Sequence, residues 1–202
     1  MITIIDYGVG NLFSLSSSLS YIGADVKISG SAEDILRADK LILPGVGAFA
    51  DAAKKLRDSG LAKIVCDEAK RGKDIMGICL GMQLLFEESH EYGVHEGLGL
   101  IPGRVEYMGD YIGSELKIPH IGWNALNIRR KSRLLCKVKG GDFVYFVHSY
   151  FAKTHDEYIT STSDYGYPIT ATVENGNVMG CQFHPEKSGE VGLNILRAFC
   201  EV

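Results

Sequence analysis

The pattern of apolar and polar positions changes character near the middle of the chain. In the first half, short apolar runs alternate with segments of helical length, and the runs predict strands at residues 2–5, 25–29, 40–43 and 74–78. Helices are predicted at residues 11–22, at 49–71 with an interruption near Ser59-Gly60, and at 80–88. Strands that alternate with helices predict a mostly parallel, doubly wound α/β sheet.

The pattern in the second half of the chain predicts antiparallel strands. Residues 143–151 form a long aromatic and β-branched run, which predicts a strand. Residues 169–173 and 178–183 flank Asn175-Gly176, and Asn-Gly between two apolar runs predicts a β-hairpin. Apolar residues recur at helical spacing over 191–199, which predicts a closing helix. With no linker and no repeat, we expect a single domain over residues 1–202 with antiparallel strands appended to its α/β half.

Composition and charge narrow the class of protein. The 202 residues are 46% hydrophobic and 23% charged, which excludes a disordered chain. A net charge of -4 argues against nucleic-acid and anionic-membrane partners. The longest apolar stretch, residues 75–86, is interrupted by Gln83 and is too short to span a bilayer, and no basic residue precedes Lys27. We therefore expect a cytoplasmic protein.

The cysteines and the basic residues carry little further signal. Five cysteines is an odd number, and none forms a C-x-x-C pair, which is typical of a reduced intracellular protein. No paired ligands stand at metal-binding spacing, so we expect no metal and no cofactor. A basic cluster between Arg129 and Lys139 is interpreted as a solvated face, with a phosphate or protein contact as the alternative.

The segment most informative about chemistry is Gly77-Ile78-Cys79-Leu80-Gly81. It matches G-x-nucleophile-x-G with Cys in place of Ser, directly after a strand and before a helix. Such a turn exposes the thiol at the carboxyl edge of the sheet, where the helix N-terminus favours thiolate. The Leu80 amide would then face a developing oxyanion. The alternative is that Cys79 is a small buried hydrophobe, as most free cysteines are.

A thiol nucleophile needs a base, and the base needs an orienting group. His184-Pro185-Glu186 follows the strand predicted at 178–183. Residues two apart on an extended segment point the same way, and Pro185 biases His184 towards extended geometry. Glu186 would therefore hold the His184 ring in one tautomer. By itself the tripeptide is better interpreted as the end of a surface strand. The nucleophile turn favours the catalytic interpretation, because each motif supplies what the other lacks.

A glycine-rich loop, Pro44-Gly45-Val46-Gly47, follows the strand predicted at 40–43. It should therefore lie at the same sheet edge as Cys79 and can turn amides towards an oxyanion. A competing interpretation is a dinucleotide-binding fingerprint, because residues 45–50 fit G-x-G-x-x-A and Asp67 and Glu68 follow roughly 20 residues on. Against it, the loop follows the third strand rather than the first.

With these motifs, the chain resembles the class I glutamine amidotransferases, whose signature is Gly77-Ile78-Cys79-Leu80-Gly81-Met82-Gln83 with His184-Pro185-Glu186. It resembles more closely the members that serve histidine biosynthesis. That narrower resemblance rests on five blocks that span nearly the whole chain in order: Asp6-Tyr7-Gly8-Val9-Gly10-Asn11, Pro44-Gly45-Val46-Gly47, Pro119-His120-Ile121-Gly122-Trp123-Asn124, Tyr145-Phe146-Val147-His148-Ser149-Tyr150 and Lys187-Ser188. The resemblance implies a flavodoxin-like sheet with the class I glutamine amidotransferase fold.

The resemblance also assigns roles to single residues. It implies Cys79 as nucleophile, His184 as base and Glu186 as its orienting group. The amides of Val46 and Leu80 would form the oxyanion hole, Val46 after a peptide flip. The substrate glutamine would be held by Gly47, Gln83, His148, Ser149 and Tyr150. A (β/α)₈-barrel synthase subunit would be contacted by Asn11, Trp123, Tyr145 and Lys187.

The implied reaction is hydrolysis of glutamine to glutamate and ammonia through a cysteinyl thioester. The partner would use the ammonia to make imidazole glycerol phosphate and an aminoimidazole carboxamide ribonucleotide. Two other classes stay open at this point. One is another enzyme with a cysteine nucleophile turn, such as a γ-glutamyl hydrolase or a protein of the DJ-1 type. The other is a non-enzymatic module in which residues 77–81 are only a tight turn, or a nucleotide binder using residues 45–50.

Overall fold

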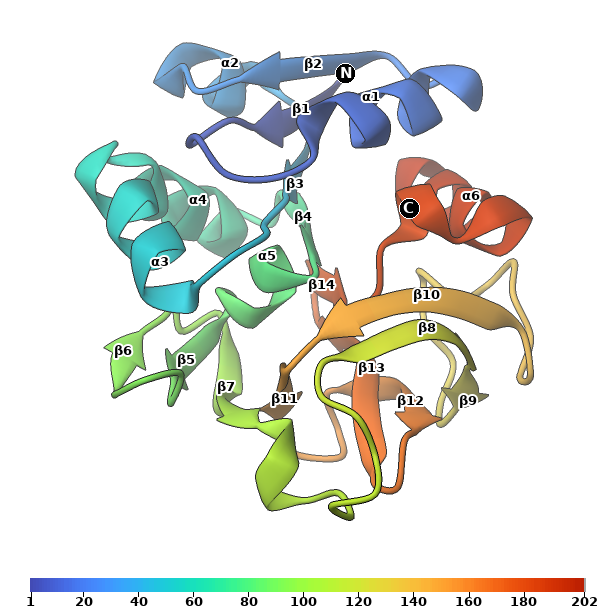
Figure 1. Ribbon diagram of the computed structural model, residues 1–202. Helices are drawn as coiled ribbons and strands as arrows, with labels where there is room; N and C mark the ends of the chain where they lie inside the picture. The colour runs from blue at the N-terminus through green and yellow to red at the C-terminus, as the bar shows by residue number, and fades with distance from the viewer. Residues whose placement is uncertain (202) are drawn as a thin grey trace.

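The computed structural model describes residues 1–201, and a central eight-stranded sheet organises them (Figure 1). Five parallel strands come first in spatial order: β2 (Val26–Ser29), β1 (Ile2–Ile5), β3 (Lys40–Leu43), β4 (Asp74–Ile78) and β14 (Val178–Cys181). Three antiparallel strands complete it: β13 (Pro168–Asn175), β12 (Ile159–Asp164) and β9 (Asn127–Ile128). The parallel part has the flavodoxin-like order, which confirms the predicted doubly wound sheet with appended antiparallel strands.

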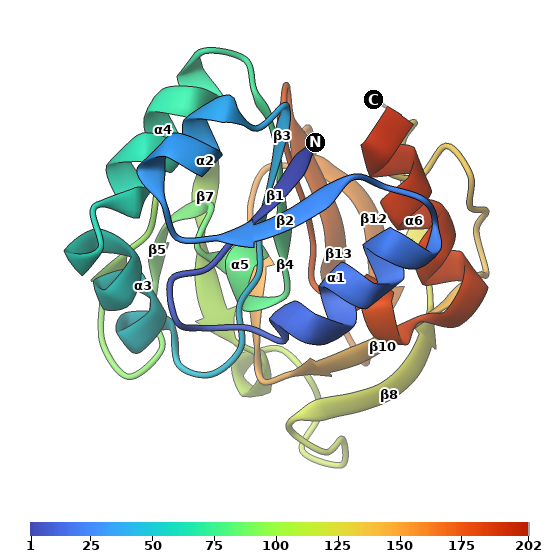
Figure 2. The same ribbon diagram turned by 90° about the horizontal axis from the view of Figure 1, so that it is seen from above.

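Helices cover both faces of the parallel strands (Figures 1 and 2). On one face lie α1 (Leu12–Tyr21) and α6 (Gly189–Glu201); on the other lie α2 (Ala32–Arg37), α3 (Phe49–Asp58) and α4 (Leu61–Lys70). Successive strand residues point to opposite faces. In β3, Leu41 and Leu43 therefore join the core under α3 and α4, while Ile42 joins the core under α1 and α6.

Two smaller sheets extend the carboxyl edge of the parallel strands. One has the order β11 (Tyr150–Lys153), β7 (Ile101–Tyr107), β5 (Phe86–Ser89) and β6 (His95–Glu96). The other pairs β10 (Phe143–His148) with β8 (His120–Ala125). The remaining elements are short: α5 (Leu80–Gln83) and the 3₁₀ turns η1 (Met108–Asp110) and η2 (Pro185–Lys187). These additions carry several of the predicted substrate and partner residues.

The structure corrects two element predictions. The helix predicted at 80–88 ends at Gln83, because Phe86 pairs with Ile101 and the chain continues as β5. The single strand predicted at 143–151 is two strands separated at Ser149, because β10 pairs with β8 while β11 pairs with β7. Helix α2 was not predicted at all. In the two corrected predictions the strand that pairs with the segment lies elsewhere in the chain, and local periodicity does not reveal it.

The predicted hairpin and the interrupted helix are confirmed. Strands β13 and β14 pair antiparallel up to Asn175 and Val178, and Gly176 in the loop has φ +59°. The predicted helix at 49–71 is α3 followed by α4, with Ser59 and Gly60 between them. Among residues 1–201, no helix is long and apolar enough to cross a membrane.

Candidate active site

Cys79 sits on a strained turn between β4 and α5. Its backbone has φ +54° and ψ -113°, a left-handed conformation that non-glycine residues seldom adopt. Glycine is required on both sides. A Cβ on Gly81 would collide with the Leu43 carbonyl, and one on Gly77 would lie 2.6 Å from Met82 Cα. The motif therefore forms the predicted nucleophile turn, and strain at the cysteine is a mark of a functional site.

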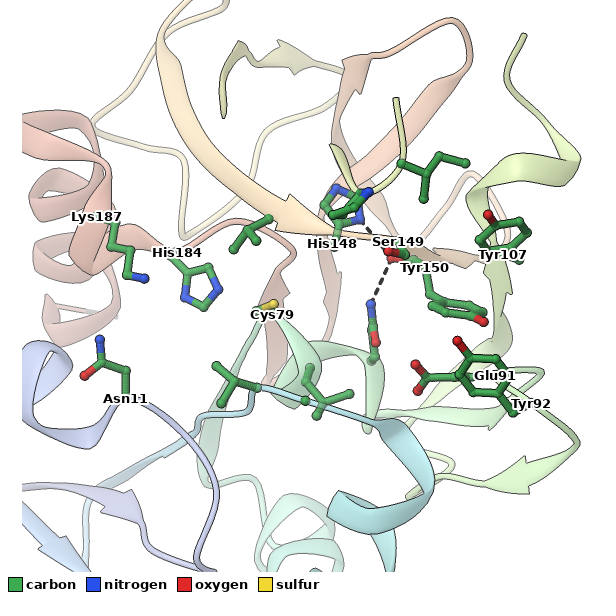
Figure 3. Close-up of a pocket in the computed structure, with 17 residues that line it drawn as sticks. Asn11, Cys79, Glu91, Tyr92, Tyr107, His148, Ser149, Tyr150, His184 and Lys187 are labelled. Carbon is green, nitrogen blue, oxygen red and sulfur yellow. Dashed lines mark hydrogen bonds between the residues drawn. The ribbon is translucent and has the colours of Figure 1, made fainter. Parts of the chain in front are cut away.

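The Cys79 thiol faces a cavity of about 590 Å³ (Figure 3). The residue itself is 7% exposed. The cavity brings together most of the predicted site: Asn11, Val46, Gly47, Leu80, Gln83, His148, Ser149, Tyr150, His184 and Lys187 also line it. These residues come from segments that are distant in sequence and meet at the carboxyl edge of the parallel strands, where ligands bind in open α/β sheets.

His184 and Glu186 form a buried pair next to Cys79. His184 Nδ1 lies 2.9 Å from Glu186 Oε1, and the two side chains are 4% and 3% exposed. The two side chains pair as predicted. The predicted backbone is wrong, because only His184 is extended and Glu186 belongs to the 3₁₀ turn η2. The turn brings the carboxylate under the ring. His184 Nε2 is buried and makes no regular hydrogen bond to residues 1–201.

The surroundings of His184 favour its protonated form. Burial by itself lowers the pKa of this imidazole, but the nearby Cys79 sulfur and the Glu186 carboxylate outweigh burial and raise the pKa to about 10. Below that pH the ring is an imidazolium facing the sulfur. A cation beside a cysteine favours the thiolate, which is the nucleophilic form.

The loop from Pro44 to Gly47 packs directly against the nucleophile turn. A Cβ on Gly45 would lie 2.7 Å from the Gly81 nitrogen, so only glycine permits this approach. Gly47 has φ +93°, while the Val46 side chain is 44% exposed at the cavity. The buried Tyr7 hydroxyl donates to the Pro44 carbonyl at 2.7 Å and anchors the start of the loop. The loop therefore lies at the predicted edge, beside Cys79.

Gln83, His148 and Tyr150 are tied together at the cavity. The Tyr150 carbonyl accepts from Gln83 Nε2 at 3.0 Å and from His148 Nδ1 at 2.8 Å. Burial lowers the pKa of His148 to about 3, so its ring is neutral at pH 7 and carries its proton on Nδ1. His148 Nε2 then accepts from His120 Nδ1, 3.3 Å away. Three predicted substrate residues thus share one hydrogen-bond network.

The four predicted partner residues divide into two pairs. Asn11 and Lys187 line the cavity (Figure 3). Trp123 of β8 and Tyr145 of β10 do not line it; their rings pack edge to face, with centroids 6.1 Å apart. Trp123 is 54% exposed. The outer face of the β8–β10 sheet is therefore an exposed aromatic surface next to the cavity.

Sequence reasoning missed several residues at the site. Glu91, Tyr92 and Tyr107 line the cavity, and Glu91 also accepts from the Phe49 amide at 2.5 Å. They come from loops and strands whose position no local pattern signals. Gln182 was the residue that sequence could have found, because it lies two positions before His184, near the end of the strand predicted at 178–183. It is fully buried, and its Nε2 lies 3.8 Å from the Cys79 sulfur.

The structure tests two further sequence interpretations, the dinucleotide-binding loop and the basic cluster. The dinucleotide alternative needs a free acidic residue after the loop, but Asp67 and Glu68 both lie inside α4 and both are ion-paired. Asp67 pairs with Lys63, and buried Glu68 pairs with Arg71 at 2.5 Å and Lys73 at 2.6 Å. The basic cluster is mostly the predicted solvated face, since Arg129, Arg130, Lys131, Lys137 and Lys139 are exposed. Arg133 is the exception. Arg133 bonds Glu174 and Asp74, each at 3.1 Å, and joins the hairpin to β4. Within residues 1–201, no group of three or more His, Cys, Asp or Glu side chains could hold a metal ion.

Comparison with known proteins defines the class. The family model described as glutamine amidotransferase class-I matches residues 3–201. A crystal structure of a glutamine amidotransferase superposes with a TM-score of 0.77 at 19% identity, covering 100% of this chain and 99% of that one. The structure of PurLQS from Thermotoga maritima gives 0.78 at 21% identity, covering 99% and 97%. The chain belongs to the class I glutamine amidotransferases and has their fold.

Curated relatives narrow the family further. The imidazole glycerol phosphate synthase subunit HisH of Listeria monocytogenes serotype 4a (strain HCC23) is 50% identical over 202 residues, which cover 100% of this chain and 96% of the relative. The HisH subunit of Bacillus licheniformis is also 50% identical, covering 98% and 95%. Within its class, the chain falls in the family of these HisH subunits.

Selective labelling tests whether the Cys79 thiol is activated. A chloroketone analogue of glutamine is expected to alkylate Cys79 faster than the other four cysteines. Burial raises the pKa of the thiols of Cys66, Cys181 and Cys200, which keeps them protonated at neutral pH. Mass spectrometry after brief labelling measures the difference. Exposed Cys136 is the internal comparator, and equal labelling of Cys79 and Cys136 would contradict activation.

Proposed function

We propose that the chain is a single glutamine amidotransferase domain that hydrolyses glutamine and passes the ammonia to a synthase subunit. The observation that carries this proposal is the buried set of Cys79, His184 and Glu186, with the cysteine on a strained turn that faces a cavity. Family membership supports it. The cytoplasmic location stays a prediction.

The chemistry follows from these three side chains. The Cys79 thiolate attacks the side-chain amide carbon of glutamine, and a C–S bond forms. The C–N bond then breaks, and His184 gives its proton to the leaving ammonia. Water next attacks the thioester while His184 takes a proton from it, and glutamate leaves with the thiol restored. Glu186 holds the ring and stabilises its charge throughout. The Leu80 and Val46 amides are proposed to bind the oxyanion.

The cavity suits a small zwitterionic substrate. The Glu91 carboxylate at its wall can pair with the α-ammonium group of glutamine, and the rings of Tyr107 and Tyr150, 5.4 Å apart, give an adjacent aromatic wall. Gly47, Gln83, His148 and Ser149 are proposed to complete the substrate site. Their amide, hydroxyl and backbone groups are neutral hydrogen-bonding partners for a neutral side-chain amide.

The face around the cavity suits a protein partner. Ile121, Trp123 and Phe143 are 59%, 54% and 54% exposed on the outer face of the β8–β10 sheet. A contiguous exposed apolar face beside a cavity is typical of an interaction site. We propose that Asn11, Trp123, Tyr145 and Lys187 contact a (β/α)₈-barrel synthase. That subunit would convert the ammonia and its ribonucleotide substrate into imidazole glycerol phosphate and an aminoimidazole carboxamide ribonucleotide.

The test is steady-state release of glutamate from glutamine by three samples: the chain alone, the chain with a barrel synthase subunit, and both with the ribonucleotide substrate. We expect weak activity alone and a large rise in kcat on addition of the ligand. The reason is the loop at Gly47. A flip of a peptide there would turn a carbonyl away from the oxyanion site and point an amide N–H donor towards it. One oxyanion donor contributes roughly 10²–10³ in rate. Identical kcat in all three samples would contradict this regulation, and no hydrolysis in any sample would contradict the function.

Replacing Gly47 by valine should remove most of the rise in kcat. A β-branched residue strains a backbone at φ +93° and restricts rotation of the neighbouring peptides. Gly23→Val is the matched control. Its φ is +84°, a Cβ there meets no atom within 4 Å, and it ends α1 away from the cavity. Both variants should lose stability, but only Gly47→Val should lose activation. Equal activation of the two would show that the loop is fixed.

A further inference from the structure

Gln182 places a neutral amide against the nucleophile. Its side chain is 0% exposed, with Nε2 at 3.8 Å from the Cys79 sulfur and Oε1 at 3.0 Å from Gln83 Nε2. A buried amide is destabilising unless its polar atoms find partners. The partners that Gln182 has are the sulfur and a substrate-site residue, which indicates a role in the site rather than in the core.

The direction of each hydrogen bond of Gln182 can be derived from a neighbouring group that can only accept. The Tyr150 carbonyl only accepts, so the Gln83 atom 3.0 Å from it must be the amide nitrogen. The second hydrogen of that nitrogen points to Gln182, so the Gln182 atom facing it must be the oxygen. The other end of the Gln182 amide is then the NH₂ group. An N–H donor therefore faces the Cys79 sulfur.

We propose that Gln182 is a positioning residue for the nucleophile, donating an N–H to the Cys79 thiolate while Gln83 holds its amide in that orientation. The inference rests on the proposed glutaminase function and deepens it. A hydrogen bond to the charged form of a group favours that form. Donation from Gln182 therefore stabilises the thiolate and holds the sulfur towards the cavity. Since Gln83 also lines the cavity, the substrate site and the nucleophile share one network.

Other titratable groups surround the sulfur, and the test must leave them unchanged. His184 faces Cys79 from the segment before η2, with Glu186 behind it. Tyr7 from the end of β1 and Cys181 from β14 also interact electrostatically with Cys79, and burial raises the pKa of both. Gln182→Met keeps all four groups in place and removes the N–H donor without adding a charge. Gln182→Glu also keeps them but adds a carboxylate facing the sulfur, which disfavours the thiolate further.

The two substitutions separate the N–H donation to Cys79 from the hydrogen bond between Gln182 and Gln83. Gln182→Glu keeps an oxygen for Gln83 to donate to but replaces the N–H that faces the sulfur. Gln182→Met keeps the length and removes both contacts. Alkylation of Cys79 by iodoacetamide, followed by mass spectrometry across pH, should shift its midpoint upwards by about one pH unit or more in both variants. With the synthase partner, kcat for glutamine should fall roughly 10-fold in both, with KM raised only in Gln182→Met.

Asn175→Ala is the control. It removes an amide bond to the Leu100 carbonyl, 3.0 Å long, at the far end of the hairpin. It should lower thermal stability without moving the alkylation midpoint, which separates positioning from general loss of structure. Unchanged midpoints in folded Gln182→Glu and Gln182→Met would overturn the proposal.

A measurement on the unsubstituted Gln182 covers the case in which both variants unfold. The side-chain amide NMR signals of Gln182 should change with pH as Cys79 titrates, and this change should vanish in Cys79→Ala. Amide signals that show the same pH dependence in the unsubstituted chain and in Cys79→Ala would overturn the proposal. Failure of the proposed function would look different, because glutamate release would be absent from the unsubstituted chain with its partner, while the alkylation and NMR results would still report on Gln182.

Discussion

Glutamine hydrolysis should fall by about 10⁴-fold or more when Cys79 is replaced by alanine. Without the thiol, no thioester forms, and the remaining groups supply only binding and oxyanion stabilisation. The fold should survive. The substitution removes only the sulfur atom, and the strained backbone at φ +54° is held by the neighbouring glycines and the sheet edge. The measurement is glutamate release in the complex with the synthase, together with thermal unfolding of the variant.

The same variant provides its own control. With ammonium salt in place of glutamine, the complex of Cys79→Ala with the synthase should still turn over the ribonucleotide, because only the source of ammonia has been lost. A substitution at Cys181 serves for comparison, since that cysteine is buried on the neighbouring strand and is not at the turn. Near-normal glutamate release from Cys79→Ala would contradict the assignment of the nucleophile.

Replacing His184 by alanine should be nearly as damaging as removing Cys79. The imidazole both stabilises the thiolate and transfers the proton to ammonia, so its loss affects attack and departure alike. Glu186→Ala should lose less, because an orienting group contributes through the base it holds. The measurement is kcat for glutamine in each variant, with KM to check that substrate binding persists. Equal and small losses would mean that His184-Pro185-Glu186 is only the end of a strand.

The pH dependence of Glu186→Ala gives a second readout. Glu186 raises the pKa of His184, so removing the carboxylate should lower that pKa from its value of about 10. The imidazolium is present below the pKa and lost above it. The alkaline decline in glutaminase rate should therefore begin at lower pH in Glu186→Ala than in the parent chain. If the alkaline decline in rate begins at the same pH in both, the role proposed for Glu186 is contradicted.

Residues that lie close together in sequence were predictable. The nucleophile turn follows from Gly77-Ile78-Cys79-Leu80-Gly81, where Gly77 packs against the nearby Met82 backbone; the Leu43 carbonyl that also requires Gly81 comes from a distant strand. The pairing of His184 with Glu186 was also predicted from residues close in sequence, although the 3₁₀ turn was not. The hairpin at Asn175 and Gly176 rests on turn chemistry alone.

Several contacts across the sheet edge were not predictable. Glu91 and Tyr92 reach the cavity because β5 pairs with β7 and places the following loop at the cavity wall. The break at Ser149 depends on two different partner strands. Tyr7 gains its contact with Pro44 because β1 and β3 are neighbours. Each contact is set by long-range pairing, which the alternation of apolar residues does not encode.

For this protein, the sequence by itself determined the doubly wound sheet, the strained cysteine turn and the histidine–glutamate pair. Backbone sterics, strand periodicity and turn chemistry act over a few residues and can be read from neighbouring side chains. Only the tertiary structure decided which polar groups surround the sulfur. The orientation of Gln182 follows from Gln83 and the Tyr150 carbonyl, three groups from separate segments that burial forces to satisfy one another.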